Sequence, residues 1–274
     1  MVEFLAAPFA ACLVLTGIHC YLGIHVVQRG VIFVDLSLAQ VAALGSAVAV
    51  LAGYELNTTG AYHFSLAFTV IGAAIFAFWR FSEEKIPQEA LIGIVYAVAS
   101  AAAILVLDRA PHGHEAIKSM LVGSILWVTW WKVIQTAIIY VIIGAIHFFL
   151  RKQFFAISES HDDAKARGMK VWFWDFIFYV SFGIVVTSSV QIAGVLLVFS
   201  YLVVPAVIAM LFKTGILTRL IIGWVTGTVV SAIGLYASMT WDLPTGAAVV
   251  TTFGIALIIA SLVKVVMRKM SIAV

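Results

Sequence analysis

Charged side chains are scarce in this sequence. Asp, Glu, Lys and Arg make up 11% of its 274 residues, while hydrophobic residues make up 64% and the mean hydropathy is +1.12. A soluble domain carries roughly 25% charged residues, because its surface faces water. The scarcity therefore excludes an ordinary soluble protein and indicates a chain that lies in a membrane.

Cysteine is also nearly missing, since only Cys12 and Cys20 occur, both in one apolar run. Two cysteines so placed make neither a disulfide framework nor a zinc-binding pattern, and we expect two small buried side chains. The chain contains no GxxxxGK[ST] phosphate-binding loop and no HExxH pair. These gaps argue against nucleotide chemistry on this chain and against an intramembrane enzyme.

Long apolar runs fill most of the chain, and each has the length of about 20 residues that a membrane-spanning helix needs. The predicted spans cover 4–27, 30–53, 61–80, 89–108, 132–150, 172–190, 191–212, 216–237 and 244–266. We divide the nearly unbroken run 172–212 at the polar TSSVQ, because 41 residues is about two spans; left undivided, it gives eight. The sequence predicts an all-α, polytopic membrane protein with eight or nine spans in one domain, 1–274.

The N-terminus, the short apolar segment 119–130 and the distribution of basic residues indicate how the chain is oriented in the membrane. No Lys or Arg precedes the first apolar run, so we interpret it as a span and not as a cleaved signal peptide. The apolar segment 119–130 is too short to cross and is predicted to be re-entrant or interfacial. With the N-terminus outside, all but three of the 16 Lys and Arg residues are cytoplasmic. This asymmetry is what the positive-inside rule requires, so we expect a cytoplasmic C-terminus.

The longest cytoplasmic loop, about 151–171, has the signals of a short helix. Ser158 or Ser160 is the expected N-cap and Gly168 the expected C-cap, with acidic residues early and basic residues late between them. The acidic and basic residues are Glu159, Asp162, Asp163, Lys165 and Arg167. The loop is either an amphipathic helix that docks into another protein or a solvated connector.

Four stretches, spread from the second span to the last, share a recognisable order and spacing. They are GVIFVDLSLAQVAALG, DDAKARGMK, GVLLVFSYLVVPAVIAM from 194 to 210, and DLPTGAAVV from 242 to 250. Together they resemble the permease subunit of the ABC importers that take up zinc, manganese or iron. The resemblance implies a homodimer in the plasma membrane of a prokaryote, which is the inner membrane in a Gram-negative cell. It also implies that the transported ion is moved by alternating access.

The resemblance also implies partners. A separate cytoplasmic ATPase would hold the ATP, and an extracytoplasmic binding protein would deliver the metal ion, so that this chain itself would bind no cofactor and no nucleic acid. The loop residues Asp163, Ala164, Arg167 and Gly168 would then belong to the coupling helix that sits in a groove of the ATPase.

The second span departs from the pattern D-x-x-S-H-x-x-x-x-G that many members of the family carry. With Gly45 aligned, Gln40 stands at the His position and Leu36 at the Asp position, while Asp35 comes one residue early. An amide is a poor ligand for zinc, which prefers imidazole and thiolate, but it is tolerable for manganese. The departure leaves the identity of the ion open.

The polar residues of the second span can be placed on its helical faces. Asp35 and Gln40 lie about 140° apart, so they are not expected to hold one ion together. Ser37 and Gln40 share a face, and Gln40 either lines the pathway or bonds a neighbouring helix. Asp35 lies near the cytoplasmic end, where Arg29 is within reach, and we expect it in an ion pair at the mouth.

Histidines offer two further candidate metal sites. His25 has the same depth as Asp35, so the two either form a site between two helices or remain apart. His112, His114 and Glu115 lie on the outer face and form either a weak collecting site or a polar loop without metal. We interpret His63 and His147, at the ends of spans, as side chains that reach toward the membrane surface.

Two later motifs complete the candidate residues. Ser200, Tyr201 and Pro205 place hydroxyl groups beside a proline in an apolar run, which suits either a moving pathway wall or a kinked packing helix. Asp242 precedes the last span on the outer side and is a candidate contact for the binding protein.

The main alternative to a metal-ion permease is a permease for a corrinoid or a metal–siderophore chelate, which would need a wider and more polar pathway. A secondary carrier would show repeated broken helices instead.

Overall fold

The computed structural model describes residues 2–55, 58–82, 86–108, 123, 125–212 and 215–272. Within these ranges, ten α-helices and one short 3₁₀ helix follow one another, and no strand occurs. They are α1 (Val2–Arg29), α2 (Val34–Leu51), α3 (Thr59–Ser82), α4 (Gln88–Leu107), η1 (Ile125–Trp127), α6 (Trp130–Phe149), α7 (Arg151–Glu159), α8 (His161–Ala166), α9 (Val171–Leu211), α10 (Ile216–Thr240) and α11 (Thr245–Ile272). The predicted all-α fold is confirmed.

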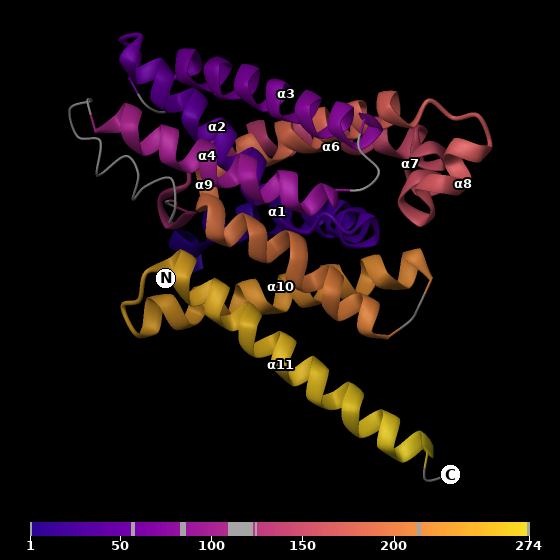
Figure 1. The fold of residues 1–274 in the computed structure, drawn as a ribbon. Helices are drawn as coiled ribbons and strands as arrows, with labels where there is room; N and C mark the ends of the chain where they lie inside the picture. The colour runs from indigo at the N-terminus through magenta and orange to yellow at the C-terminus, as the bar shows by residue number, and fades with distance from the viewer. Residues whose placement is uncertain are drawn as a thin grey trace.

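Eight helices of the described chain are long and apolar enough to cross a membrane. One of them, α9, has 41 residues. Such a helix would be about 61 Å long when straight, twice the 30 Å of a hydrocarbon core. Gly194 interrupts it with φ 74° and ψ 163°. Figure 1 shows α9 folding back, so that it begins and ends at the side of the bundle where α7 and α8 lie. It supplies two spans, divided four residues after the predicted position of 190.

The break in α9 depends on glycine. The backbone angles of Gly194 fall in a region that residues with a Cβ essentially never occupy. A second glycine, Gly123, packs directly against it, because a Cβ at Gly123 would lie 2.2 Å from the carbonyl carbon of Ala193. The chain at residue 123 therefore covers the break and leaves no room for a larger side chain.

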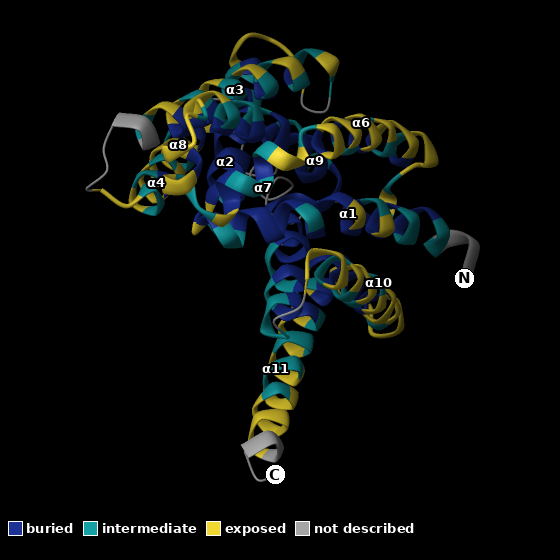
Figure 2. Cartoon of the chain, turned by 90° about the vertical axis from the view of Figure 1, so that its right-hand side faces the viewer, coloured by how far each residue is buried: buried dark blue, intermediate teal, exposed yellow. Residues whose placement is uncertain are grey.

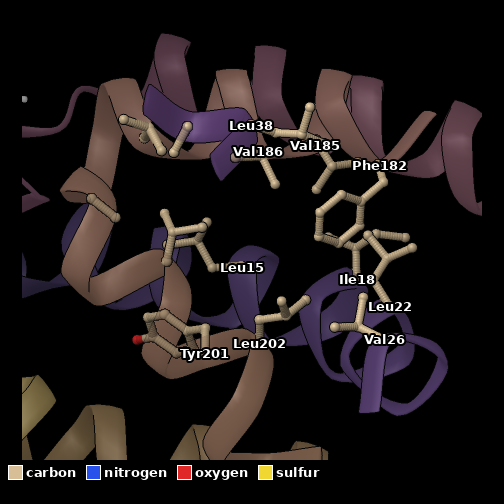
Figure 3. Close-up of a cluster of buried hydrophobic side chains, with 14 of the residues drawn as sticks. Leu15, Ile18, Leu22, Val26, Leu38, Phe182, Val185, Val186, Tyr201 and Leu202 are labelled. Carbon is tan, nitrogen blue, oxygen red and sulfur yellow. The ribbon is translucent and has the colours of Figure 1, made fainter. Parts of the chain in front are cut away.

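The core lies along α1, α2 and α9, which are mostly buried in Figure 2. Side chains of α1 such as Leu15 and Leu22 face Phe182 and Leu202 from the two parts of α9 (Figure 3). The approach is close, since a Cβ at Gly23 of α1 would lie 1.9 Å from the carbonyl oxygen of Leu202. In contrast, α11 projects away from the rest and exposes most of its apolar side chains (Figures 1 and 2). The central helices thus form a closely packed core with α11 at its margin.

Two predicted loop segments have a different form in the structure. The loop expected to hold one short helix holds two, α7 and α8, because Phe154 and Ile157 bury an apolar side of α7. Of the segment 119–130, residues 119–122 and 124 lie outside the described residues. The described remainder contains η1 and the first residue of α6, where Trp127 and Trp130 are exposed.

Candidate functional site

A buried ion pair joins three helices at the end of α1. Arg29, the last residue of α1, donates from Nη1 to Oδ1 of Asp175 in α9 at 2.5 Å and from Nε to Oγ of Ser158 in α7 at 2.8 Å. The side chains of Arg29 and Asp175 are 0% and 1% exposed. The guanidinium lies 4.0 Å from the ring centre of Phe178. Because removing either partner would strand a buried charge, this contact holds the three helices in one arrangement.

Ser158 links His25 to this ion pair. Its Oγ lies 2.8 Å from Nδ1 of His25 and donates its single proton to the carbonyl oxygen of Phe154, also at 2.8 Å. The Nδ1 of His25 is therefore the donor, and its Nε2 carries a free lone pair. This Nε2 is buried with no hydrogen-bond partner in the described part of the chain.

His147 repeats the arrangement with Ser181. Its Nε2 lies 2.8 Å from Oγ of Ser181, which donates to the carbonyl oxygen of Phe178 at 2.9 Å. The ring of Tyr21 lies between the two imidazoles, at 4.7 Å from His25 and 5.5 Å from His147. The neighbouring guanidinium of Arg29 repels a cation, so this pair of imidazoles is a poor place for a metal ion.

Several oxygen atoms without partners occur near the start of α2, on more than one of its faces. Asp35 and Ser37 are 2% and 0% exposed. Within the described ranges, neither Oδ1 of Asp35 nor Oγ of Ser37 has a hydrogen-bond partner. Glu89 of α4 accepts from the backbone N–H of Phe33 at 3.1 Å through Oε1, while its Oε2 is buried and unpartnered among the described residues. Carboxylate and hydroxyl oxygens of this kind are ligands that hard divalent cations prefer. Gln40, one turn further along α2, is 8% exposed.

A pocket of about 750 Å³ opens at the same side of the bundle. Its lining includes Arg29, Glu89, His161, Lys165, Trp172 and Asp175. It therefore separates the start of α4 from α8 and from the first turns of α9. The ion pair and the carboxylate of Glu89 both reach its wall.

The helix α8 lies between the capping residues that the sequence predicts. Ser160 caps it by accepting from the N–H of Asp163 at 3.2 Å, and Gly168 ends the turn after it with φ 77°. Ala164 is 1% exposed and packs with Ile157 and Val171. Asp163, Arg167 and Gly168 are exposed. Three of the four predicted coupling residues thus face outward, while Ala164 anchors α8 to the permease.

The predicted pathway residues of α9 lie in its second part. Ser200 donates to the carbonyl oxygen of Leu196 at 3.0 Å, and the hydroxyl of Tyr201 lies 2.6 Å from Oγ of Ser231 in α10. Pro205 is buried inside the helix. Both hydroxyl groups are therefore satisfied within the protein, which is the arrangement expected of a packing helix.

The opposite side of the bundle holds the break at Gly194 and the turn between α10 and α11. Lys132 donates to Oε1 of Gln191 at 3.0 Å, three residues before the break. Asp242 is exposed in the turn with φ 50°. The predicted collecting site of His112, His114 and Glu115 lies outside the described residues.

Two expectations differ from the structure. Arg29 pairs with Asp175 and not with Asp35, because the start of α9 passes the end of α1. His147, expected to reach toward the membrane surface, is 1% exposed and points inward. His25 bonds Ser158 through Nδ1, and a site shared with Asp35 stays a prediction; in the described ranges no three or more His, Cys, Asp or Glu residues form a group that could hold a metal ion. Asp175 was missed, although it is the sole charged residue in the sequence of α9.

Comparisons with known proteins agree with this architecture. The "Manganese transport system membrane protein MntC" of Listeria monocytogenes is 28% identical over 240 residues, covering 86% of this chain and 85% of that protein. The "Probable iron transport system membrane protein" of Haemophilus influenzae is 25% identical over 235 residues, covering 86% and 81%. The solved structure of PsaBC from Streptococcus pneumoniae in complex with Fab has the same fold, with a TM-score of 0.78 at 21% identity over 94% of this chain and 90% of that chain. A model of the ABC 3 transport family matches residues 1–264, and the chain therefore belongs to this family.

Proposed function

We propose that the chain is the permease subunit of an ATP-driven importer for a transition metal ion, manganese or iron. The observation that carries the proposal is the family match over residues 1–264. Relatives that cover most of the chain are named as manganese and iron transport proteins, which favours these ions over zinc. As a permease, the chain would hold no ATP and carry out no chemistry on the ion.

The proposed partners act at opposite sides of the bundle. A cytoplasmic ATPase would dock on the exposed side of α8, where Asp163 and Arg167 offer charges of both signs. A binding protein on the outer side would release the ion near His112, His114 and Glu115 and would contact Asp242. In keeping with the resemblance to metal importers, two copies of the permease would form one transporter in a prokaryotic plasma membrane.

The pathway is proposed to run along α2. Asp35, Ser37 and Gln40 supply oxygen ligands, and the first two hold buried oxygen atoms that have no partner in the described part of the protein. A buried polar group without a partner is costly, and a passing divalent cation would satisfy the oxygen that faces it. Asp35 and Ser37 are two residues apart and lie on different faces of α2, so they would not bind one ion together. Oxygen ligands suit manganese better than zinc, in agreement with the name of the relative from Listeria monocytogenes.

The proposal is tested by uptake into liposomes that contain the permease with its ATPase and binding protein. Manganese, ferrous iron and zinc are offered in turn with ATP, and the permeases compared are wild type, Gln40→Ala and Ser37→Ala. A matched control is Ser100→Ala, because Ser100 donates to its own helix at the carbonyl oxygen of Tyr96 and lies on an exposed side.

We expect ATP-dependent uptake of manganese or iron that falls in Gln40→Ala and Ser37→Ala and is unchanged in Ser100→Ala. Uptake that is equal in all four permeases would remove α2 from the pathway. If none of the three free ions is taken up while ATP is hydrolysed, the assignment to a free metal ion is wrong and the larger ligand is favoured.

A further inference from the structure

The helix α8 is connected to the membrane-spanning helices through the buried ion pair. Its first residue, His161, places Nε2 at 3.9 Å from Oδ2 of Asp175. Its Ala164 packs against Val171, the first residue of α9. A displacement of α8 therefore acts directly on the first turns of α9 and on Asp175.

The ion pair extends this connection to α1. Arg29 binds Asp175 and Ser158 at once, so that α1, α7 and α9 share one guanidinium group. A buried ion pair adds little stability compared with apolar side chains of the same size, whereas its geometry is strict. A contact of this kind fixes the relative position of helices more than it strengthens the fold.

The arrangement of α9 determines where such a movement would go. Asp175 and Gly194 are separated by 19 residues of continuous helix, and the intervening length of about 28 Å is close to the thickness of a membrane core. The first part of α9 thus connects α8 on one side of the bundle to the break on the other. The pocket of about 750 Å³ beside the ion pair leaves space in which α8 and α9 can shift against α4.

We propose that the Arg29–Asp175 ion pair transmits the movement of α8 to α1 and to the break at Gly194, which makes both residues positioning residues for translocation. The proposal rests on the proposed function, since the ATPase is what would displace α8. Loss of the pair would leave an ATPase that still hydrolyses ATP but moves few ions.

The experiment measures manganese uptake and ATP hydrolysis in the same liposomes, with the permease assembled with its ATPase and binding protein. The variants are Asp175→Asn, which removes the charge at constant shape, Arg29→Gln, and Arg29→Lys, which keeps a charge but loses the fork that reaches Ser158. The control is Arg151→Gln, because Arg151 is an exposed arginine at the start of α7 whose described contacts are both with the nearby Phe148, through its carbonyl oxygen and its ring.

We expect the number of ions moved per ATP to fall about tenfold or more in Asp175→Asn and Arg29→Gln, while ATP hydrolysis stays close to that of wild type. Arg29→Lys should recover part of the ratio, and Arg151→Gln should keep all of it. Uptake and hydrolysis that fall in parallel would overturn the proposal, since they would show a merely structural role. A wild-type ratio of ions moved per ATP in Asp175→Asn and Arg29→Gln would overturn the proposal as well.

A second measurement does not depend on the transported ion. Spin labels at Ala166 of α8 and at Leu196, two residues after the break, are both exposed and report the distance between α8 and the break in α9 before and after ATP is added. We expect an ATP-dependent change in wild type that is lost in Asp175→Asn. If the distance between the labels changes equally in wild type and in Asp175→Asn, the proposal is overturned. If this distance changes with ATP in wild type but no manganese is taken up, only the assigned ion is wrong. If Asp175→Asn does not assemble, Ser158→Ala takes its place with the same two readings.

Discussion

Replacing Gly194 by alanine should destabilise the protein, because the break in α9 needs a backbone that alanine avoids. The angles of Gly194, φ 74° and ψ 163°, lie in a region that is essentially restricted to glycine. A residue with a Cβ held there costs about 1–3 kcal/mol of folding free energy. In a regular helix the same change has the opposite sign, since alanine restricts the unfolded chain and stabilises the fold by about 0.4–1 kcal/mol.

The matched control for this prediction is Gly93→Ala. Gly93 lies in α4 on an exposed side, and an added Cβ there meets no atom within 4 Å. The free energy of unfolding of both variants is measured in mixed micelles by titration with a denaturing detergent. We expect Gly194→Ala to fall below wild type by about 1–3 kcal/mol and Gly93→Ala to remain at or above it. If Gly194→Ala were as stable as wild type, the chain at 194 would be able to form ordinary helix, and the reasoning would be refuted.

Three further predictions concern packing, hydrogen bonding and docking. Gly23→Ala should cost about 1–3 kcal/mol in the same titration, because its Cβ would overlap the carbonyl oxygen of Leu202 unless α1 and α9 separate; an unchanged stability would contradict the close approach. Tyr201→Phe should cost about 0.5–1.5 kcal/mol through loss of the buried bond to Ser231, and a neutral result would mean that the hydroxyl faces water. Arg167→Glu should reduce the amount of the proposed ATPase that copurifies with the permease and leave the free energy of unfolding unchanged, because Arg167 is exposed directly after α8. Undiminished copurification would place the docking surface elsewhere.

The membrane spans could be predicted from the sequence because each depends on local hydropathy. The caps of α8 could also be predicted from the sequence, since Ser160 and Gly168 act on residues within one turn of themselves. Both signals arise from neighbours in the chain and need no knowledge of the tertiary structure.

The position of the break in α9 was not accessible in the same way. The polar TSSVQ predicts the division near residue 190, but Ser188 and Ser189 donate to the carbonyl oxygens of Ile184 and Val185 four residues earlier, at 2.6 Å and 2.5 Å. A hydroxyl group satisfied in this way stays inside a helix. The chain breaks instead at Gly194, a glycine whose sequence neighbours are all apolar.

Much of the candidate site depends on contacts between distant parts of the chain. Arg29 and Asp175 are 146 residues apart, and nothing near Arg29 indicates which acidic residue it meets. The pattern that could have found Asp175 is an acid isolated in a long apolar run, which rarely stands without a cationic partner. Asp35 and Ser37 are recognisable in the sequence as polar residues of the second span, but that Oδ1 of Asp35 and Oγ of Ser37 lack hydrogen-bond partners among the described residues depends on the tertiary structure.

The fold of α9 also bears on how the chain enters the membrane during synthesis. Its 41 residues contain no lysine or arginine, so the charge asymmetry that orients other spans gives no signal at Gly194. The two parts of α9 are therefore expected to insert together as a hairpin, with the glycine at its tip. A reporter domain spliced in directly after Gly194 would have to be carried across with that tip, and the side on which it ends would show whether the two parts cross the membrane as one hairpin.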